Sequence, residues 1–193
     1  MCRHVAYFIS LALIVAVFYF NSAVAGDPCV SGLKPNEKPG PYSAIVAVGK
    51  ERGEAPHCFI CDAAERPAVI VFARHLDDPL AKLVSAIDKA VADNKKAELR
   101  GWVTFLNDDQ AAFDPLVVDW AKKHAIRNVP LAVFEDVTGP PTYKLGRDAD
   151  VTVLLFTKHK VVNNFAFRSG ELTDERIAEI LKAIPTLLEG DKK

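Results

Sequence analysis

Two cysteines separated by two residues are the side chains of this chain best suited to chemistry. They stand in the run Cys58-Phe59-Ile60-Cys61. Thiols at this spacing can form and break a local disulfide, and such a pair near alternating strand and helix patterns is typical of redox exchange. One of Cys58 and Cys61 would attack a substrate and the other would resolve the intermediate. A protonated His57, directly before the pair, would lower the pKa of a neighbouring thiol.

Two other interpretations of this pair stay open. The cysteines at 58 and 61 could form a structural disulfide that staples a loop to the first strand. With His57 and Cys29 they could supply thiolate and imidazole ligands suited to zinc or copper(I), although no second CxxC supports such a site. The pair is not a haem-attachment site, because Asp62 stands where histidine is required. The sequence therefore predicts catalytic cysteines at 58 and 61, with no resident cofactor or metal.

Residues 1–25 are typical of a secretory signal. Arg3 gives a short positive start, an apolar run extends from Val5 to Phe20, and Ala23-Val24-Ala25 supplies small residues at the spacing of a cleavage site. We expect cleavage before Gly26 and a periplasmic or secreted protein. Disulfides persist in these oxidising compartments. An uncleaved membrane anchor is the alternative, although the run is short of the roughly 20 residues that a spanning helix needs.

The composition restricts the classes of partner. The chain has 193 residues, with 24 Lys and Arg against 25 Asp and Glu, and a formal net charge of −1. This balance, without a basic block, argues against binding to nucleic acid. No apolar stretch after the leader is long enough to cross a membrane. The cysteine pair instead predicts a partner protein that carries thiols or a disulfide.

The remaining chain divides into three parts. Residues 26–41 are rich in Gly, Pro, Lys and Asn and are predicted to form an extended, weakly ordered N-terminal segment. Residues 42–188 are long enough for one domain with a proper core, and residues 189–193 form a polar tail.

Strand and helix patterns alternate through the domain. Continuous apolar runs indicate strands buried on both faces of a parallel sheet, and the last two runs, separated by a short turn, indicate an antiparallel hairpin. The predicted strands of one sheet are 68–73, 101–106, 129–134, 151–156 and 161–167. Helices are predicted to begin near Asp78, Asp114 and Thr173, because acidic or hydroxyl side chains cap helices and Pro follows two of them.

This order of elements resembles the thioredoxin fold, and the strand at 129–134 with the long connection after it resembles the redoxin and peroxiredoxin branch. The resemblance rests on element order and on apolar runs such as Ala68-Val69-Ile70-Val71-Phe72 and Val151-Thr152-Val153-Leu154-Leu155-Phe156. It implies an α/β, thioredoxin-like three-layer sandwich with a central mixed sheet and helices on both faces.

The chain departs from that family at the place of its chemistry. In the family the reactive cysteine follows the first central strand, at the start of the next helix, where the helix dipole stabilises a thiolate. Residues 74–79 occupy that place here and contain no cysteine, so we expect negligible peroxidase activity. His75 within them is expected to be solvated. Asp148-Ala149-Asp150 replaces the cis-proline that thioredoxins carry before the hairpin.

Two functions follow from these observations. The first is an exported thiol–disulfide oxidoreductase that uses a displaced CxxC pair. The second is a non-catalytic binding or scaffold domain of the same fold, in which the pair is a structural disulfide.

Overall fold

The computed structural model describes residues 27–189. The predicted signal peptide and the tail after Glu189 therefore lie outside the described residues. Within this range no helix has the length and apolar character needed to span a membrane. The elements in chain order are β1 (Ile45–Val48), α1 (Phe59–Ala63), β2 (Ala68–Ala73), α2 (Asp78–Asp93), the 3₁₀ helix η1 (Lys95–Ala97), β3 (Arg100–Leu106), α3 (Gln110–Lys123), β4 (Leu131–Phe134), the 3₁₀ helix η2 (Pro141–Tyr143), β5 (Val151–Thr157), β6 (Lys160–Phe167) and α4 (Asp174–Glu189).

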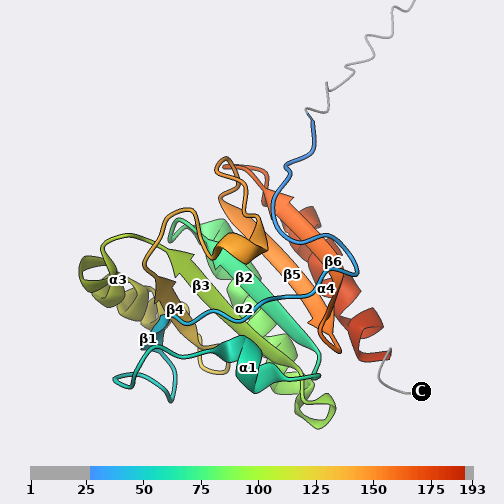
Figure 1. Cartoon of the computed structure of the whole chain (residues 1–193), viewed down its shortest axis with the longest axis horizontal. Coiled ribbons are helices and arrows are strands. Elements are labelled where there is room, and N and C mark those ends of the chain that lie inside the picture. Colours follow the sequence, from blue (N-terminus) through green and yellow to red (C-terminus); the bar gives the residue numbers. More distant parts are fainter. Residues whose placement is uncertain (1–26, 190–193) are drawn as a thin grey trace, which may run out of the picture.

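The strands form one mixed six-stranded sheet with the order β1-β4-β3-β2-β5-β6 (Figure 1). Strands β2, β3 and β4 run parallel, whereas β5 is antiparallel to both β2 and β6, and β1 is antiparallel to β4. All five predicted strands therefore lie in one sheet, and the last two form the predicted antiparallel pair. The short strand β1 extends this sheet at the free edge of β4.

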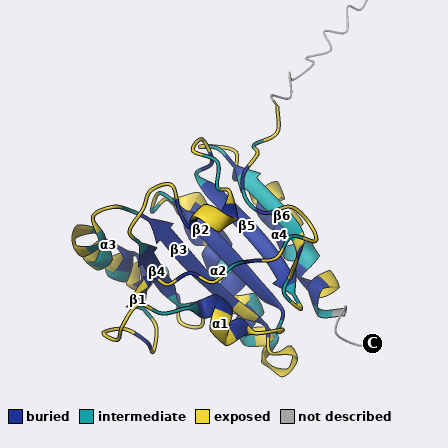
Figure 2. Ribbon diagram, viewed as in Figure 1, coloured by how far each residue is buried: buried dark blue, intermediate teal, exposed yellow. Residues whose placement is uncertain are grey.

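The two faces of the sheet are covered differently. Side chains alternate between the faces, so Val71 and Phe105 join the core under α2, α3 and α4, whereas Ile70 and Trp102 join a second core. That second core is covered by α1, η2 and the segment before β1, and Figure 2 shows how completely the central strands are buried between these layers. Helices thus lie on both faces as predicted, but the three long ones share one face.

The N-terminal segment is extended but is more firmly packed than the sequence predicted. Leu33 is buried, and the Ser31 and Thr152 hydroxyls lie 2.6 Å apart. The Asn164 side-chain amide donates to the carbonyls of Ser31 and Leu33 at 2.7 and 2.8 Å. Single apolar residues among Pro, Gly and Lys do not show this packing in the sequence, because their partners lie on β5 and β6.

Helix α3 begins earlier than predicted. Its N-cap is Asp109, whose carboxylate accepts a hydrogen bond from the Ala112 backbone at 3.0 Å. The Asp114-Pro115 pair, predicted to start this helix, lies inside it. Asp114 instead pairs with Arg52 at 2.7 Å, so its carboxylate was wrongly interpreted as a cap. The other two long helices begin at or beside their predicted starts.

Candidate functional site

The cysteine pair forms a disulfide at the first turn of α1. Cys58 and Cys61 are joined, with their Cα atoms 5.4 Å apart. Cys58 is the N-cap, and its sulfur accepts a hydrogen bond from the Cys61 backbone N–H at 3.3 Å. The predicted local pairing is therefore present. The same N–H also donates to the Cys58 carbonyl at 3.1 Å.

The two sulfur-bearing residues differ in exposure because α1 is anchored by its apolar side. Phe59 and Ile60 are buried in the second core, and the Phe59 ring stacks on Trp102 with centroids 5.6 Å apart. Cys58 is half-buried against this core, whereas Cys61 is exposed. A partner protein can therefore approach Cys61 more readily than Cys58.

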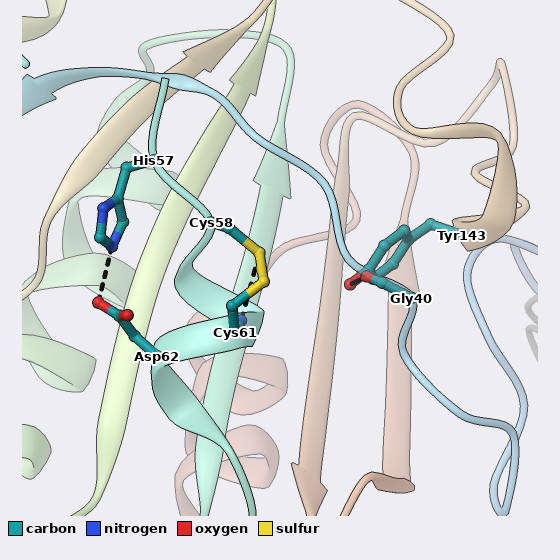
Figure 3. The surroundings of a disulfide bond; sticks show 6 residues. All are labelled: Gly40, His57, Cys58, Cys61, Asp62 and Tyr143. Carbon is teal, nitrogen blue, oxygen red and sulfur yellow. Dashed lines mark hydrogen bonds and ion pairs between the residues drawn. A yellow bond between two sulfur atoms is a disulfide. The ribbon is translucent and has the colours of Figure 1, made fainter. Parts of the chain in front are cut away.

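His57 faces a carboxylate and not the disulfide. Its Nε2 atom lies 2.9 Å from the Asp62 carboxylate, and its ring meets Phe59 at 4.6 Å between centroids. Figure 3 shows the imidazole facing Asp62, turned away from the two sulfur atoms. The sequence placed His57 beside the reactive pair, but the structure gives it a different polar partner.

A cleft of about 580 Å³ opens beside α1. One wall is the face of α1 that carries Phe59 and Asp62, and the other includes Arg100 and Arg127. These two arginines are exposed, and within residues 27–189 their guanidinium groups have no hydrogen bond or ion pair. A polypeptide bound beside the disulfide would meet unpaired positive charge here.

In the family that this chain resembles, the reactive cysteine follows the first central strand. Here that position is occupied by Arg74, which makes structural hydrogen bonds. Arg74 follows β2, and its guanidinium donates to the carbonyls of Ala149 at 2.9 Å and Gly146 at 3.1 Å, and also to that of Val137. Burial lowers the pKa of Arg74, although an arginine stays protonated at neutral pH. This connection ties the β4–β5 loop to the sheet and contains no thiol.

His75 follows in the same connection and is solvated, as predicted. Its side chain is 66% exposed and lies 3.7 Å from the Asp150 carboxylate. Asp77 then caps α2 by accepting a hydrogen bond from the Leu80 backbone at 2.8 Å. Among the described residues no peptide bond is cis.

Cys29 is separate from the reactive pair. It is unpaired and half-buried, and burial, followed by the negative charge of Asp148, raises the pKa of its thiol. The charges that act on Cys29 include Arg168, directly after β6, and Asp150, directly before β5. These ends of β5 and β6 lie away from α1 (Figure 1). The structure therefore does not bring Cys29 together with His57 and the pair, as the thiolate metal site would need.

Sequence reasoning missed two residues that matter here. Glu51 lies in a polar, glycine-bearing loop yet is only 8% exposed, and Arg74 reaches three carbonyls far away in the sequence. Neither carries a local signal, because both are defined by contacts made after folding.

Comparisons with known proteins agree on the fold. No protein-family model matches the chain, and no curated protein matches it. Among solved structures, a candidate protein disulfide isomerase from Bacteroides thetaiotaomicron is similar at 16% identity and a TM-score of 0.61, covering 82% of this chain and 93% of that one. A candidate thiol:disulfide interchange protein DsbE from Chlorobium tepidum is similar at 15% identity and a TM-score of 0.57, covering 79% and 99%. The peroxidoxin BcpB from Mycobacterium tuberculosis is similar at 12% identity and a TM-score of 0.59, covering 83% and 99%. The fold is therefore thioredoxin-like, as the element order predicted.

Proposed function

We propose that this chain of thioredoxin-like fold is an exported thiol–disulfide oxidoreductase whose reactive residues are Cys58 and Cys61. The observation that carries the proposal is the disulfide at the first turn of α1, with Cys61 exposed and Cys58 beside a backbone N–H donor. The thiol:disulfide interchange name of one similar structure supports this function. The leader-like residues 1–25 support export.

The difference in exposure supports different proposed roles for the two cysteines. A substrate thiolate attacks the Cys61 sulfur, forms a mixed disulfide, and displaces Cys58 as a thiolate that the Cys61 N–H stabilises. A second substrate thiolate then attacks the substrate sulfur of the mixed disulfide. The substrate leaves with a disulfide, and the chain keeps two thiols after the Cys58 and Cys61 thiolates have each taken up a proton. Substrate reduction is the reverse, with Cys61 attacking and Cys58 resolving.

A reductase assay on purified, oxidised protein tests the proposal. With dithiothreitol as electron donor, we expect turbidity from insulin reduction that Cys58→Ser and Cys61→Ser each abolish. Cys29→Ser is the matched control and should keep full activity, because Cys29 lies apart from the pair. Unchanged activity in both pair variants would reject the proposal.

The hypothesis of a non-catalytic binding or scaffold domain rests on a separate observation. The disulfide fixes α1, whose buried Phe59 and Ile60 close one end of the second core. The reduction potential of the pair decides between the two. We expect a value between about −120 and −270 mV, the range of known oxidoreductases, whereas a structural disulfide would fall below about −300 mV.

Peroxidase activity should be negligible in either case. The connection after β2 contains Arg74 and His75 but no cysteine, so no nucleophile occupies the place where the resembling family reacts with peroxide. A hydrogen peroxide consumption assay checks this. Rapid turnover that Cys58→Ser removes would show that the displaced pair has taken over that reaction.

A further inference from the structure

Three side chains beside the disulfide bring metal-binding atoms together. Glu51, His57 and Asp62 each offer one nitrogen or carboxylate oxygen, and the three atoms lie within 4.8 Å of one another. Glu51 comes from the loop after β1, whereas the other two flank the cysteine pair in sequence. Two separate segments of chain therefore meet at this point.

Glu51 is unusual for a carboxylate because it is almost buried without hydrogen bonds. Its side chain is 10% exposed, and across residues 27–189 it makes no hydrogen bond or ion pair except the ion pair with Lys50 at 3.3 Å. Lys50 is itself 87% exposed. Buried charges are normally paired and hydrogen-bonded, or bind metals, because desolvation of an isolated carboxylate is costly. One exposed lysine, whose charge is screened by solvent, compensates this carboxylate poorly.

The imidazole of His57 is also incompletely satisfied. Its Nε2 atom is buried and makes no hydrogen bond of acceptable geometry, although an Asp62 oxygen lies 2.9 Å away. Figure 3 shows the two side chains facing each other. The nitrogen therefore lies close to one carboxylate, with that of Glu51 farther off in the same cluster, and no directed hydrogen bond explains its position.

We propose that Glu51, His57 and Asp62 form a zinc site beside the disulfide. One imidazole nitrogen and two carboxylate oxygens are ligands that Zn²⁺ accepts, whereas Mg²⁺ and Ca²⁺ prefer sites made of oxygen alone. Tetrahedral ligands about 2.1 Å from zinc are about 3.4 Å apart, so the present spacing needs only a modest movement of side chains. Asp62 can supply it, because its side chain is 60% exposed. Water or an anionic group in the adjoining cleft would fill the fourth position.

This site differs from a thiolate site built on the cysteines. The sulfurs of Cys58 and Cys61 are bonded to each other, so they do not supply thiolate ligands in the oxidised chain. The zinc site therefore requires no reduction of the disulfide. It also does not depend on whether the pair is catalytic.

Zinc titration of the oxidised chain tests the proposal. The protein should carry Cys29→Ser, so that no free thiol in the described chain competes for the metal. With ZnCl₂ as the titrant, isothermal calorimetry should show one ion bound per chain, with MgCl₂ giving no comparable signal. His57→Gln, Glu51→Gln and Asp62→Asn should each weaken binding at least about tenfold, since changes even to outer-shell partners of zinc cost about 10–100-fold.

A second histidine–carboxylate pair provides the matched control. His75→Gln removes the imidazole near Asp150 at the other end of β2 and should leave zinc affinity unchanged. Asp62→Asn is the variant least able to disturb folding, because Asp62 is exposed. Absence of stoichiometric zinc binding, or equal affinity in wild type and all three ligand variants, would overturn the proposal. Binding that appears only after reduction would overturn it too, and would assign the metal to the thiolates. Loss of insulin reduction with zinc binding intact would reject the proposed function alone.

Discussion

Strand β2 carries a connection at each end, and the two differ in what fills them. At the α2 end, where β2 finishes, the guanidinium of Arg74 binds loop carbonyls and Asp77 caps a sixteen-residue helix. At the disulfide end, where β2 begins, a five-residue helix holds Cys58 and Cys61 next to a cleft. The first end thus has a long helix without a cysteine, and the second has a disulfide on a short helix. The cysteine pair and the long helix after β2 therefore lie at opposite ends of this strand.

The largest effect is expected at Asp88, which secures the cleft at the disulfide end. This buried carboxylate on α2 accepts hydrogen bonds from the backbone N–H groups of Arg127, Asn128 and Val129 at 3.0, 2.6 and 2.9 Å. Asp88→Ala leaves these donors without their acceptor and should lower the free energy of unfolding by about 3 kcal/mol in urea titrations. The exposed Asp93→Ala is the control and should change it by less than about 0.5 kcal/mol.

The same carboxylate should make the free energy of unfolding depend on pH, in a direction that its pKa shift fixes. Burial acts to raise the pKa of Asp88, but hydrogen bonds from Asn128 and the neighbouring backbone outweigh it, and the pKa is lowered. A lowered folded pKa means that the stabilisation is present above the ordinary value near 3.9 and is lost as the pH falls through the folded pKa. The stability gap between wild type and Asp88→Ala should therefore narrow in acid. A gap that stays constant to about pH 2 would contradict this origin of its stability.

Arg74→Met tests whether the α2 end is structural. The variant keeps much of the apolar stem but leaves three carbonyls without their donor, so it should lose about 2–3 kcal/mol of unfolding free energy. Arg147→Met, an exposed cation nearby, should cost little. If Arg74→Met is stable but alters thiol exchange, the proposed division between the two ends of β2 is wrong.

Much of the architecture was predictable because it depends on local patterns. The apolar runs of β2 and β5 are continuous since both faces of these strands are covered, and the cap before α2 is a short-range signal. The predicted start of α3 was wrong because Asp114-Pro115 has the same local pattern as a true helix cap. In the folded chain Asp114 instead pairs with Arg52, which is distant in sequence. The CxxC was visible, whereas the burial of Glu51 depends on contacts that only the folded chain makes.

The two cysteines of the pair should differ in reactivity by about tenfold. In a Cys29→Ser background, Cys58→Ala leaves the exposed Cys61 and Cys61→Ala leaves the half-buried Cys58. Thiolate exchange depends on access as well as on pKa, so Ellman's reagent should react about ten times faster with Cys61. The rates should become equal in denaturant. Faster reaction of Cys58 in the native protein would exchange the roles assigned above.

A cysteine introduced at the α2 end tests how far the dipole of a long helix lowers the pKa of a thiol. Asp77→Cys puts a thiol at the N-cap of a sixteen-residue helix, where the dipole should lower its pKa by about one unit from the usual 8.5. Asn94→Cys, at the C-cap of the same helix, should titrate at or above that value. The pH dependence of iodoacetamide alkylation in a Cys29→Ser background gives both values. Equal pKa values at the two positions would show that the α2 end offers no advantage to a thiolate.

The smallest effect is expected at Cys29, the native thiol at the α2 end. Burial and the carboxylate of Asp148 raise the pKa of its thiol, with Arg168 opposing them. A smaller thiolate fraction at pH 8 should make alkylation of the oxidised protein several times slower than that of a free cysteine peptide. Asp148→Asn should speed this alkylation slightly, because it removes one negative charge, whereas the remote Asp93→Asn should not. Alkylation faster than that of the peptide would show that the positive charge of Arg168 outweighs burial and Asp148, so that the pKa of the Cys29 thiol is lowered. The α2 end of β2 would then favour the thiolate of Cys29.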